Sequence, residues 1–256
     1  MRSLVFLLIL TSVAGAQQAP AAKAPRTSPW FKAQTIDFVA LTPAPPAPGS
    51  ELDRQDMKEV LLEQRTRTAA QIQQAQADDK EEDMFAFATV LGPKFTAAEL
   101  PLTAAFSQHL RDASAVINNP MKVYYGRPRP FVTSAEVHPV CEKTASNSYP
   151  SGHSMVGTLE ALALTQIVPE RSPEILHRLD QYTQNRVVCG VHYPSDVAAS
   201  RLIATSLYGL IAASPDFQRE LTGAKAEVRS HLGLAAAPVH ADALPSSAST
   251  HAVRAR

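Results

Sequence analysis

Three short polar stretches stand out in this chain, because their residue types could bind and transfer a phosphoryl group. They are MKVYYGRPRPF at 121–131, SYPSGHSMVG at 148–157 and NRVVCGVHYPSD at 185–196. In the second stretch, Ser151 precedes a long apolar run and is suited to cap a helix there. A helix N-terminus with small residues is also an anion site, because its free N–H groups point outward.

The polar residues of the three stretches form the set that metal-free phosphoryl transfer needs. They are Lys122, Arg129, Ser151, Gly152, His153, Arg186, His192 and Asp196. Arginine and lysine supply charge and directed donors to a phosphate dianion. A neutral histidine can attack phosphorus when a carboxylate orients its ring, and a second histidine can protonate the departing alcohol. Each piece alone also fits a solvated basic surface or a structural His–Asp pair, so only the combination favours catalysis.

One further arginine of the first stretch, Arg127, has a spacing that fits no part of this set. We expect its side chain to lie on the surface.

The spacing of the three stretches resembles a known signature. Lys122-x6-Arg129-Pro130, then Pro-Ser-Gly-His at 150–153, then Arg186-x5-His192-x3-Asp196 is similar to the three-part signature of the type 2 phosphatidic acid phosphatase superfamily. Within it, the chain looks most like the bacterial class A nonspecific acid phosphatases, which are exported and all-helical. The resemblance covers residues 51–232. The family commonly has Ser before the third-motif arginine, where this chain has Asn185.

The resemblance implies a role for each residue. His192 becomes the nucleophile that forms a phosphohistidine, Asp196 holds its ring, and His153 is the acid for the leaving group. The phosphate would be bound by Lys122, Arg129, Ser151, Gly152 and Arg186. The resemblance also implies small phosphomonoester substrates, inhibition by vanadate or phosphate, and no metal or other cofactor. It leaves open whether the enzyme forms a homo-oligomer.

Other functions fit parts of the same pattern. A lipid or isoprenoid (pyro)phosphate phosphatase of the same superfamily is the main alternative, and a vanadium-dependent haloperoxidase resembles the same pocket. A zinc hydrolase could use His153, His192 and Asp196 as ligands. A phosphate-binding module without activity would need the same charges.

Helical spacing dominates the part of the chain that carries the motifs. Leu102, Phe106, Leu110, Ala113 and Ile117 follow one another at intervals of four, four, three and four, which indicates a helix. Residues 172–188 have an amphipathic pattern, whereas 151–168 and 195–213 are apolar nearly all round and should be buried. Alternating strand patterns are scarce. We therefore predict a single all-α domain over 51–232, a helical bundle, and the resemblance implies the phosphatidic acid phosphatase/haloperoxidase kind.

The two ends of the chain differ from this domain. Residues 1–16 have an arginine, a short apolar stretch and an Ala-Gly-Ala end, which predicts a cleaved signal peptide and a periplasmic protein without a stable membrane anchor. Residues 17–50 are rich in Pro and Ala and predict an irregular arm, and 233–256 predict a disordered tail.

Charge and cysteine content narrow the function further. The 256 residues carry a formal net charge of zero and no basic run, which argues against binding to nucleic acid. Cys141 and Cys189 are the only two cysteines, and an even count in an exported chain favours a disulfide over two buried free thiols.

Overall fold

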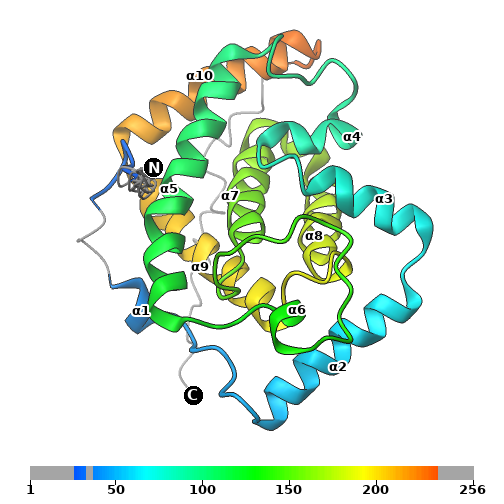
Figure 1. The fold of residues 1–256 in the computed structure, drawn as a ribbon. Coiled ribbons are helices and arrows are strands. Elements are labelled where there is room, and N and C mark those ends of the chain that lie inside the picture. The colour runs from blue at the N-terminus through cyan, green and yellow to red at the C-terminus, as the bar shows by residue number, and fades with distance from the viewer. Residues whose placement is uncertain (1–25, 33–36, 236–256) are drawn as a thin grey trace, which may run out of the picture.

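The computed structural model describes residues 26–32 and 37–235, and every regular element within them is helical (Figure 1). The predicted all-α bundle is confirmed for this part of the chain. The expected signal peptide at 1–16 lies outside the described residues, as does the expected tail beyond residue 235.

Seven longer helices build the described part of the bundle, and five short ones connect them. The longer helices are α2 (Glu51–Thr66), α3 (Ala69–Asp78), α5 (Pro101–Tyr125), α7 (Gly152–Ile167), α8 (Ser172–Val188), α9 (Pro194–Ile211) and α10 (Pro215–His231). The short ones are α1 (Phe38–Leu41), η2 (Met84–Phe87), α4 (Ala88–Leu91), α6 (Pro130–Thr133) and η3 (Pro169–Arg171).

Helix α7 is the centre of the bundle. It packs against α5, α8, α9 and α10, and in Figure 1 it lies between α5 and α8. Its buried side chains are distributed around the helix, as expected from its apolar sequence. At Gly157 a Cβ atom would lie 2.7 Å from the ring of Tyr182 on α8, so only glycine allows this close packing of the two helices.

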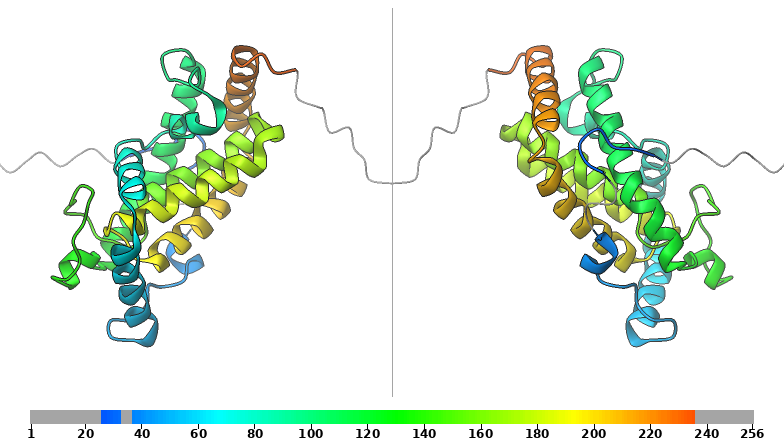
Figure 2. Two further views of the ribbon diagram at one scale, coloured as in Figure 1. Left: turned by 90° about the vertical axis from the view of Figure 1, so that its right-hand side faces the viewer. Right: turned by 90° about the vertical axis from the view of Figure 1, so that its left-hand side faces the viewer.

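The three polar stretches lie where several helices begin or end. Lys122 is in the last turn of α5 and Arg186 in the last turn of α8. Ser151 caps α7, and Asp196 is in the first turn of α9. Helices α2 and α3 run crosswise to α7 and α8 (Figure 2), and both contact α8.

A disulfide joins Cys141 to Cys189, as predicted from the even cysteine count. Cys141 lies in the loop between α6 and α7, and Cys189 is the C-terminal cap of α8. The bond therefore ties this long loop to the helix that carries Arg186.

The segment before α2 contributes to the core. The Trp30 ring lies 5.0 Å from that of Phe217 and 5.6 Å from that of Phe106, measured between centroids, and Phe38 of α1 is buried. These contacts join the described part of the expected arm to α5 and α10.

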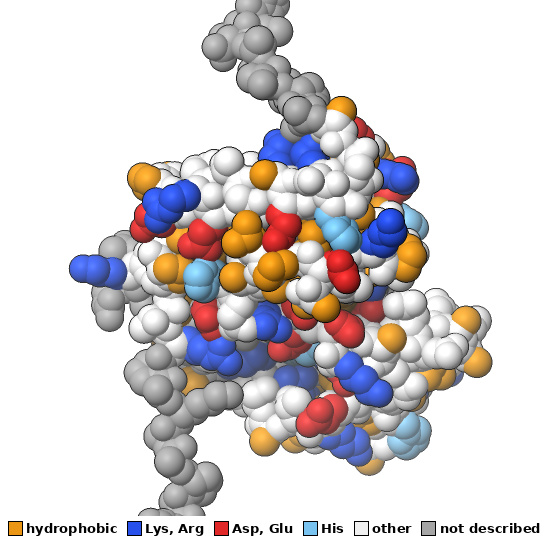
Figure 3. All heavy atoms as spheres, turned by 90° about the horizontal axis from the view of Figure 1, so that it is seen from above, with side chains coloured by type: hydrophobic (Ala, Val, Ile, Leu, Met, Phe, Trp, Pro, Cys, Tyr) orange, Lys and Arg blue, Asp and Glu red, His pale blue; other side chains and the backbone are white. Residues whose placement is uncertain are grey.

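In the part of the chain that the structure describes, no single helix has both the length and the apolar character to cross a membrane. The pair α9 and α10 meets both conditions together, with a bend of 101° between the two helices. On the face shown in Figure 3, acidic and basic side chains are interspersed.

Candidate active site

His192 is a buried imidazole with a different partner on each nitrogen. It lies just before α9, whose first turn carries Asp196. The His192 Nδ1 atom lies 3.3 Å from Asp196 Oδ2, and Nε2 lies 3.2 Å from an Arg129 nitrogen. Burial lowers the pKa of His192 well below its usual value, and the positive charges of Arg129 and Lys122 lower it further. The neutral ring required of a nucleophile is therefore favoured.

The Asp196 carboxylate is held by several donors. Its Oδ2 atom accepts hydrogen bonds from the Ser148 hydroxyl at 2.5 Å and the Tyr193 backbone N–H at 3.0 Å. Its Oδ1 atom accepts from Arg127 at 2.7 Å. With these bonds in place, Oδ2 is fixed towards the imidazole and can orient it.

The expectation for Arg127 is wrong: its side chain is not on the surface but only 7% exposed. Its guanidinium donates to Asp196 and also to Asp56 on α2, at 2.8 Å. Burial lowers the pKa of Arg127, but the neighbouring Asp196 and Asp56 outweigh it, so the pKa is raised. The spacing within the first stretch could not reveal this role, because Asp56 comes from a charged helix about 70 residues away.

Arg129 and Lys122 place two positive charges beside His192. Arg129 is fixed by the backbone oxygens of Ser146 at 2.8 Å and Val191 at 2.9 Å. Lys122 Nζ donates to the Asn147 backbone oxygen at 2.7 Å. Burial lowers the pKa of Lys122 to about 7, and Arg129 adds to this effect. Lys122 therefore loses its charge near neutral pH.

Ser151 and Gly152 form the start of α7. The Ser151 backbone N–H donates to the Ser200 hydroxyl of α9 at 2.7 Å, and its own hydroxyl oxygen accepts from the Ser154 hydroxyl at 3.0 Å. A Cβ at Gly152 would lie 3.2 Å from the Asn118 amide nitrogen of α5, so glycine keeps this helix start close to its neighbour. The free backbone N–H groups in the first turn of α7 are of the kind that binds anions at helix N-termini.

In the Arg186 guanidinium, a terminal nitrogen has a hydrogen-bond partner and Nε has none among the described residues. A terminal nitrogen of its guanidinium donates to Asp79 at 2.7 Å. Its Nε–H is buried without a hydrogen-bond partner among the described residues. A buried unpaired donor is costly, so this group would gain from an anion in the site.

His153 lies on the first turn of α7, and both ring nitrogens face acceptors. Its Nδ1 atom lies 2.7 Å from Glu82 Oε1, and Nε2 lies 3.2 Å from the Asp79 backbone oxygen. Asp79 is therefore bonded to both Arg186 and His153. Nothing in the sequence singles out Asp79 and Glu82, because an acidic run after a helix is usually a solvated face.

Short contacts join most of the expected site residues in two groups, one around His192 and one around Asp79. Arg129 contacts His192, which contacts Asp196, and the Ser151 N–H lies 3.4 Å from the Asp196 backbone oxygen. Lys122 binds the loop that carries Ser148, while Arg186 and His153 share Asp79.

Among the described residues, one group of possible metal ligands converges, formed by Asp79 and the two cysteines. Cys141 and Cys189 are joined to each other, so they offer no thiolates. His153 faces Glu82 and Asp79, and the zinc set of His153, His192 and Asp196 does not converge.

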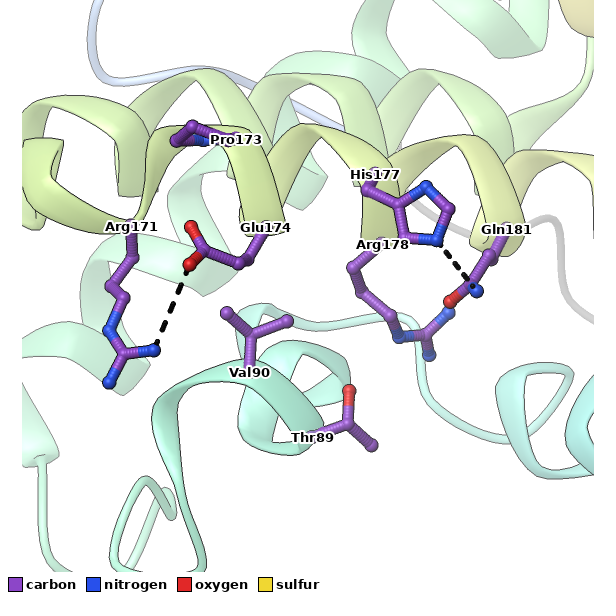
Figure 4. Close-up of a pocket in the computed structure, with 8 residues that line it drawn as sticks. All are labelled: Thr89, Val90, Arg171, Pro173, Glu174, His177, Arg178 and Gln181. Carbon is purple, nitrogen blue, oxygen red and sulfur yellow. Dashed lines mark hydrogen bonds and ion pairs between the residues drawn. The ribbon is translucent and has the colours of Figure 1, made fainter.

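A separate groove of about 630 Å³ lies between α4 and α8 (Figure 4). Val90 and Pro173 line it, together with an ion pair of 3.9 Å between Arg171 and Glu174. None of the expected site residues lines this groove.

Comparisons with known proteins identify the family of this chain. A family model described as the PAP2 superfamily matches residues 102–220. A non-specific acid phosphatase of Providencia stuartii is 31% identical over 205 residues, covering 76% of this chain and 82% of that protein. The chain belongs to the PAP2 superfamily. A non-specific acid phosphatase of Salmonella typhi is 35% identical over 149 residues, covering 56% of this chain and 59% of that protein. Within the PAP2 superfamily, these relatives place the chain with the class A-type acid phosphatases.

A solved structure supports the PAP2 fold. The bacterial vanadium-dependent iodoperoxidase superposes with a TM-score of 0.54 at 18% identity, covering 67% of this chain and 52% of that one. At this identity the similarity concerns the fold alone.

Proposed function

We propose that the chain hydrolyses small phosphomonoesters with broad specificity, through a phosphohistidine formed on His192. The observation that carries this proposal is the pair of contacts on that ring. Asp196 faces Nδ1 at 3.3 Å, and the cation Arg129 lies 3.2 Å from Nε2. A carboxylate on Nδ1 keeps the proton there, which leaves the Nε2 lone pair for attack beside a phosphate-binding cation.

In the first step, His192 Nε2 attacks phosphorus and the bond from phosphorus to the alcohol oxygen breaks. His153 gives a proton to the departing oxygen, so the alcohol leaves neutral. In the second step, water attacks phosphorus and the phosphorus–nitrogen bond breaks. His153 takes the proton of this water, inorganic phosphate leaves, and both histidines return to their initial states.

The phosphate would be held by Lys122, Arg129, Arg186, Ser151 and Gly152. The three cations oppose the charge on the equatorial oxygens, and the start of α7 adds N–H donors. The buried Arg186 Nε–H supports this role, because a phosphate oxygen would supply the acceptor that the described residues do not. Phosphate and vanadate should both inhibit by binding the same groups.

The proposed reaction needs no metal, because side-chain cations take the role of a Lewis acid. His192 must be neutral and His153 protonated, so the rate should be greatest on the acid side of neutrality. We place the enzyme in the periplasm, in line with the signal peptide predicted at residues 1–16. Vesicle binding by the processed chain would contradict the absence of a stable membrane anchor.

The test is hydrolysis of p-nitrophenyl phosphate with and without chelator and vanadate, followed by acid quenching. Activity should survive the chelator and fall with vanadate, and a phosphoenzyme should appear in the parent but not in His192→Ala. His177→Ala, which changes a histidine of the groove between α4 and α8, is the matched control. Full activity in His192→Ala refutes the assigned nucleophile. Faster turnover of a long-chain lipid phosphate would replace the proposal by its lipid-phosphatase alternative.

A further inference from the structure

We infer that Glu82 is a positioning residue for the leaving-group acid: its carboxylate holds Nδ1 of His153 and so aims Nε2 at the alcohol oxygen. This inference rests on the proposed function. The Glu82 Oε1 atom lies 2.7 Å from His153 Nδ1, a short charge-assisted contact. Glu82 would thus do for the acid what Asp196 does for the nucleophile.

Asp78 and Asp79, at the C-terminal end of α3, anchor the segment that carries Glu82. Arg178 donates to both carboxylate oxygens of Asp78, at 2.6 and 3.0 Å, and Asn185 donates to one of them at 2.7 Å. Asp79 then binds Arg186 at 2.7 Å and accepts from the Glu142 backbone N–H at 3.0 Å. The C-terminal end of α3 is therefore attached to α8, three residues ahead of Glu82.

Tyr182 contacts both the segment that carries Glu82 and the ring of His153. Its hydroxyl donates to the Glu81 backbone oxygen at 2.6 Å. Its ring is stacked with that of His153, at 6.4 Å between centroids and 30° between planes. Because Gly157 admits the Tyr182 ring against α7, the same side chain places both His153 and the residue before Glu82.

Both ring nitrogens of His153 face hydrogen-bond acceptors. Glu82 faces Nδ1 and the Asp79 backbone oxygen faces Nε2, and only the imidazolium donates to both. The positive charges near Glu82 are His153, Arg186 and Arg111 of α5, and the hydrogen bond from His153 is the main cause that lowers the Glu82 pKa. The carboxylate therefore stays ionised in the acid range where the enzyme should work.

The contact of His153 Nε2 is the longer of the two polar contacts on this ring. A substrate oxygen has to replace only the weak 3.2 Å contact with the Asp79 backbone, while the Nδ1 contact stays in place. Loss of Glu82 would remove the shorter of the two polar contacts that orient the ring. Loss of the acid matters most for alcohols that leave poorly as anions.

The test compares Glu82→Gln with the parent on p-nitrophenyl phosphate and on an alkyl phosphate. We expect kcat/KM to fall about 10- to 100-fold for the alkyl phosphate and less than about threefold for the aryl phosphate. Glu81→Gln is the matched control, because Glu81 is exposed and is used through its backbone oxygen. In a His153→Ala background, Glu82→Gln should have no further effect. Equal losses on both substrates, or additive losses in the double variant, would overturn the inference.

A second readout does not depend on activity. The Nδ1 proton of His153 should give a low-field proton resonance, assigned by its loss in His153→Ala, that disappears in Glu82→Ala and persists in Glu81→Gln. Its persistence in Glu82→Ala would overturn the inference. A parent that hydrolyses neither phosphate would instead refute the proposed function, and the resonance would still decide whether Glu82 holds the ring.

Discussion

The two histidines of the site lie in different environments. The side chains of His192 and Asp196 are 2% and 0% exposed, whereas those of His153 and Glu82 are 17% and 49% exposed. The first carboxylate has three further donors, from Ser148, Tyr193 and Arg127, and the second is held by a segment at the end of α3. Under the proposed roles, the group that attacks phosphorus in one geometry is buried, and the group that meets varied alcohols is near the surface.

The largest expected effect is the difference in kcat/KM between variants of the two histidines. His192→Ala should lower kcat/KM by about 10⁴- to 10⁶-fold for every phosphomonoester, because no attacking atom remains. His153→Ala should cost about 10²- to 10⁴-fold for an alkyl phosphate and much less for p-nitrophenyl phosphate. Steady-state kinetics with the two substrates measures both. If the losses were alike for both variants and both substrates, the division of roles would be wrong.

The second effect concerns the stability of the buried side. Arg127→Met leaves Asp196 and Asp56 without their cation, and loss of one partner of a buried pair costs about 3–5 kcal/mol of unfolding free energy. Arg54→Met removes an ion pair with Glu51, whose side chains are 63% and 83% exposed, and should cost about 0–1 kcal/mol. Urea denaturation measures both variants. If the two variants lost equal unfolding free energy, the ion pairs of Arg127 with Asp56 and Asp196 would not behave as buried ones.

The third effect is a loss of stability and of substrate affinity when the disulfide is removed. Replacing Cys141 and Cys189 by serine should lower the unfolding free energy by about 2–4 kcal/mol, because the unfolded chain gains freedom. The loop that they tie carries Ser146 and Ser148, which contact Arg129 and Asp196. We therefore expect the KM of the double variant to rise as well. The control is the KM of the parent, measured under oxidising and under reducing conditions. An unchanged KM would show that the loop keeps its place without the bond.

The smallest effect is a pH dependence of anion binding. Because the pKa of Lys122 is lowered to about 7, its positive charge is present below that pH and is lost as the pH rises. Inhibition by phosphate should weaken about tenfold from pH 6 to pH 8, although phosphate itself gains negative charge over this range. Lys122→Arg keeps its charge and should flatten the dependence. Inhibition constants that stay level in the parent would place Lys122 outside the phosphate site.

The sequence predicted the helices and the contacts between residues close in sequence better than the contacts between distant segments. The periodicity at 102–117 and the apolar runs of α7 and α9 report burial directly, so the bundle followed. His192 and Asp196 are four residues apart, and their contact is local. Arg127 and Glu82 depend on α2 and on the end of α3, about 70 residues from their partners, and nothing in their spacing reveals that contact. Trp30 was similarly hidden in a segment whose composition indicates an irregular arm.

The disulfide has a consequence for where the enzyme becomes competent. Thioredoxin and glutathione keep thiols of the cytosol reduced, so a chain still waiting for export would carry its Ser146–Ser148 loop untethered. Small phosphate esters inside the producing cell would then meet an enzyme whose loop beside Arg129 and Asp196 is not yet held by the bond. Under the proposed export, oxidation of Cys141 and Cys189 after translocation would tether this loop outside the cytosol, and recombinant production would need the same oxidising route.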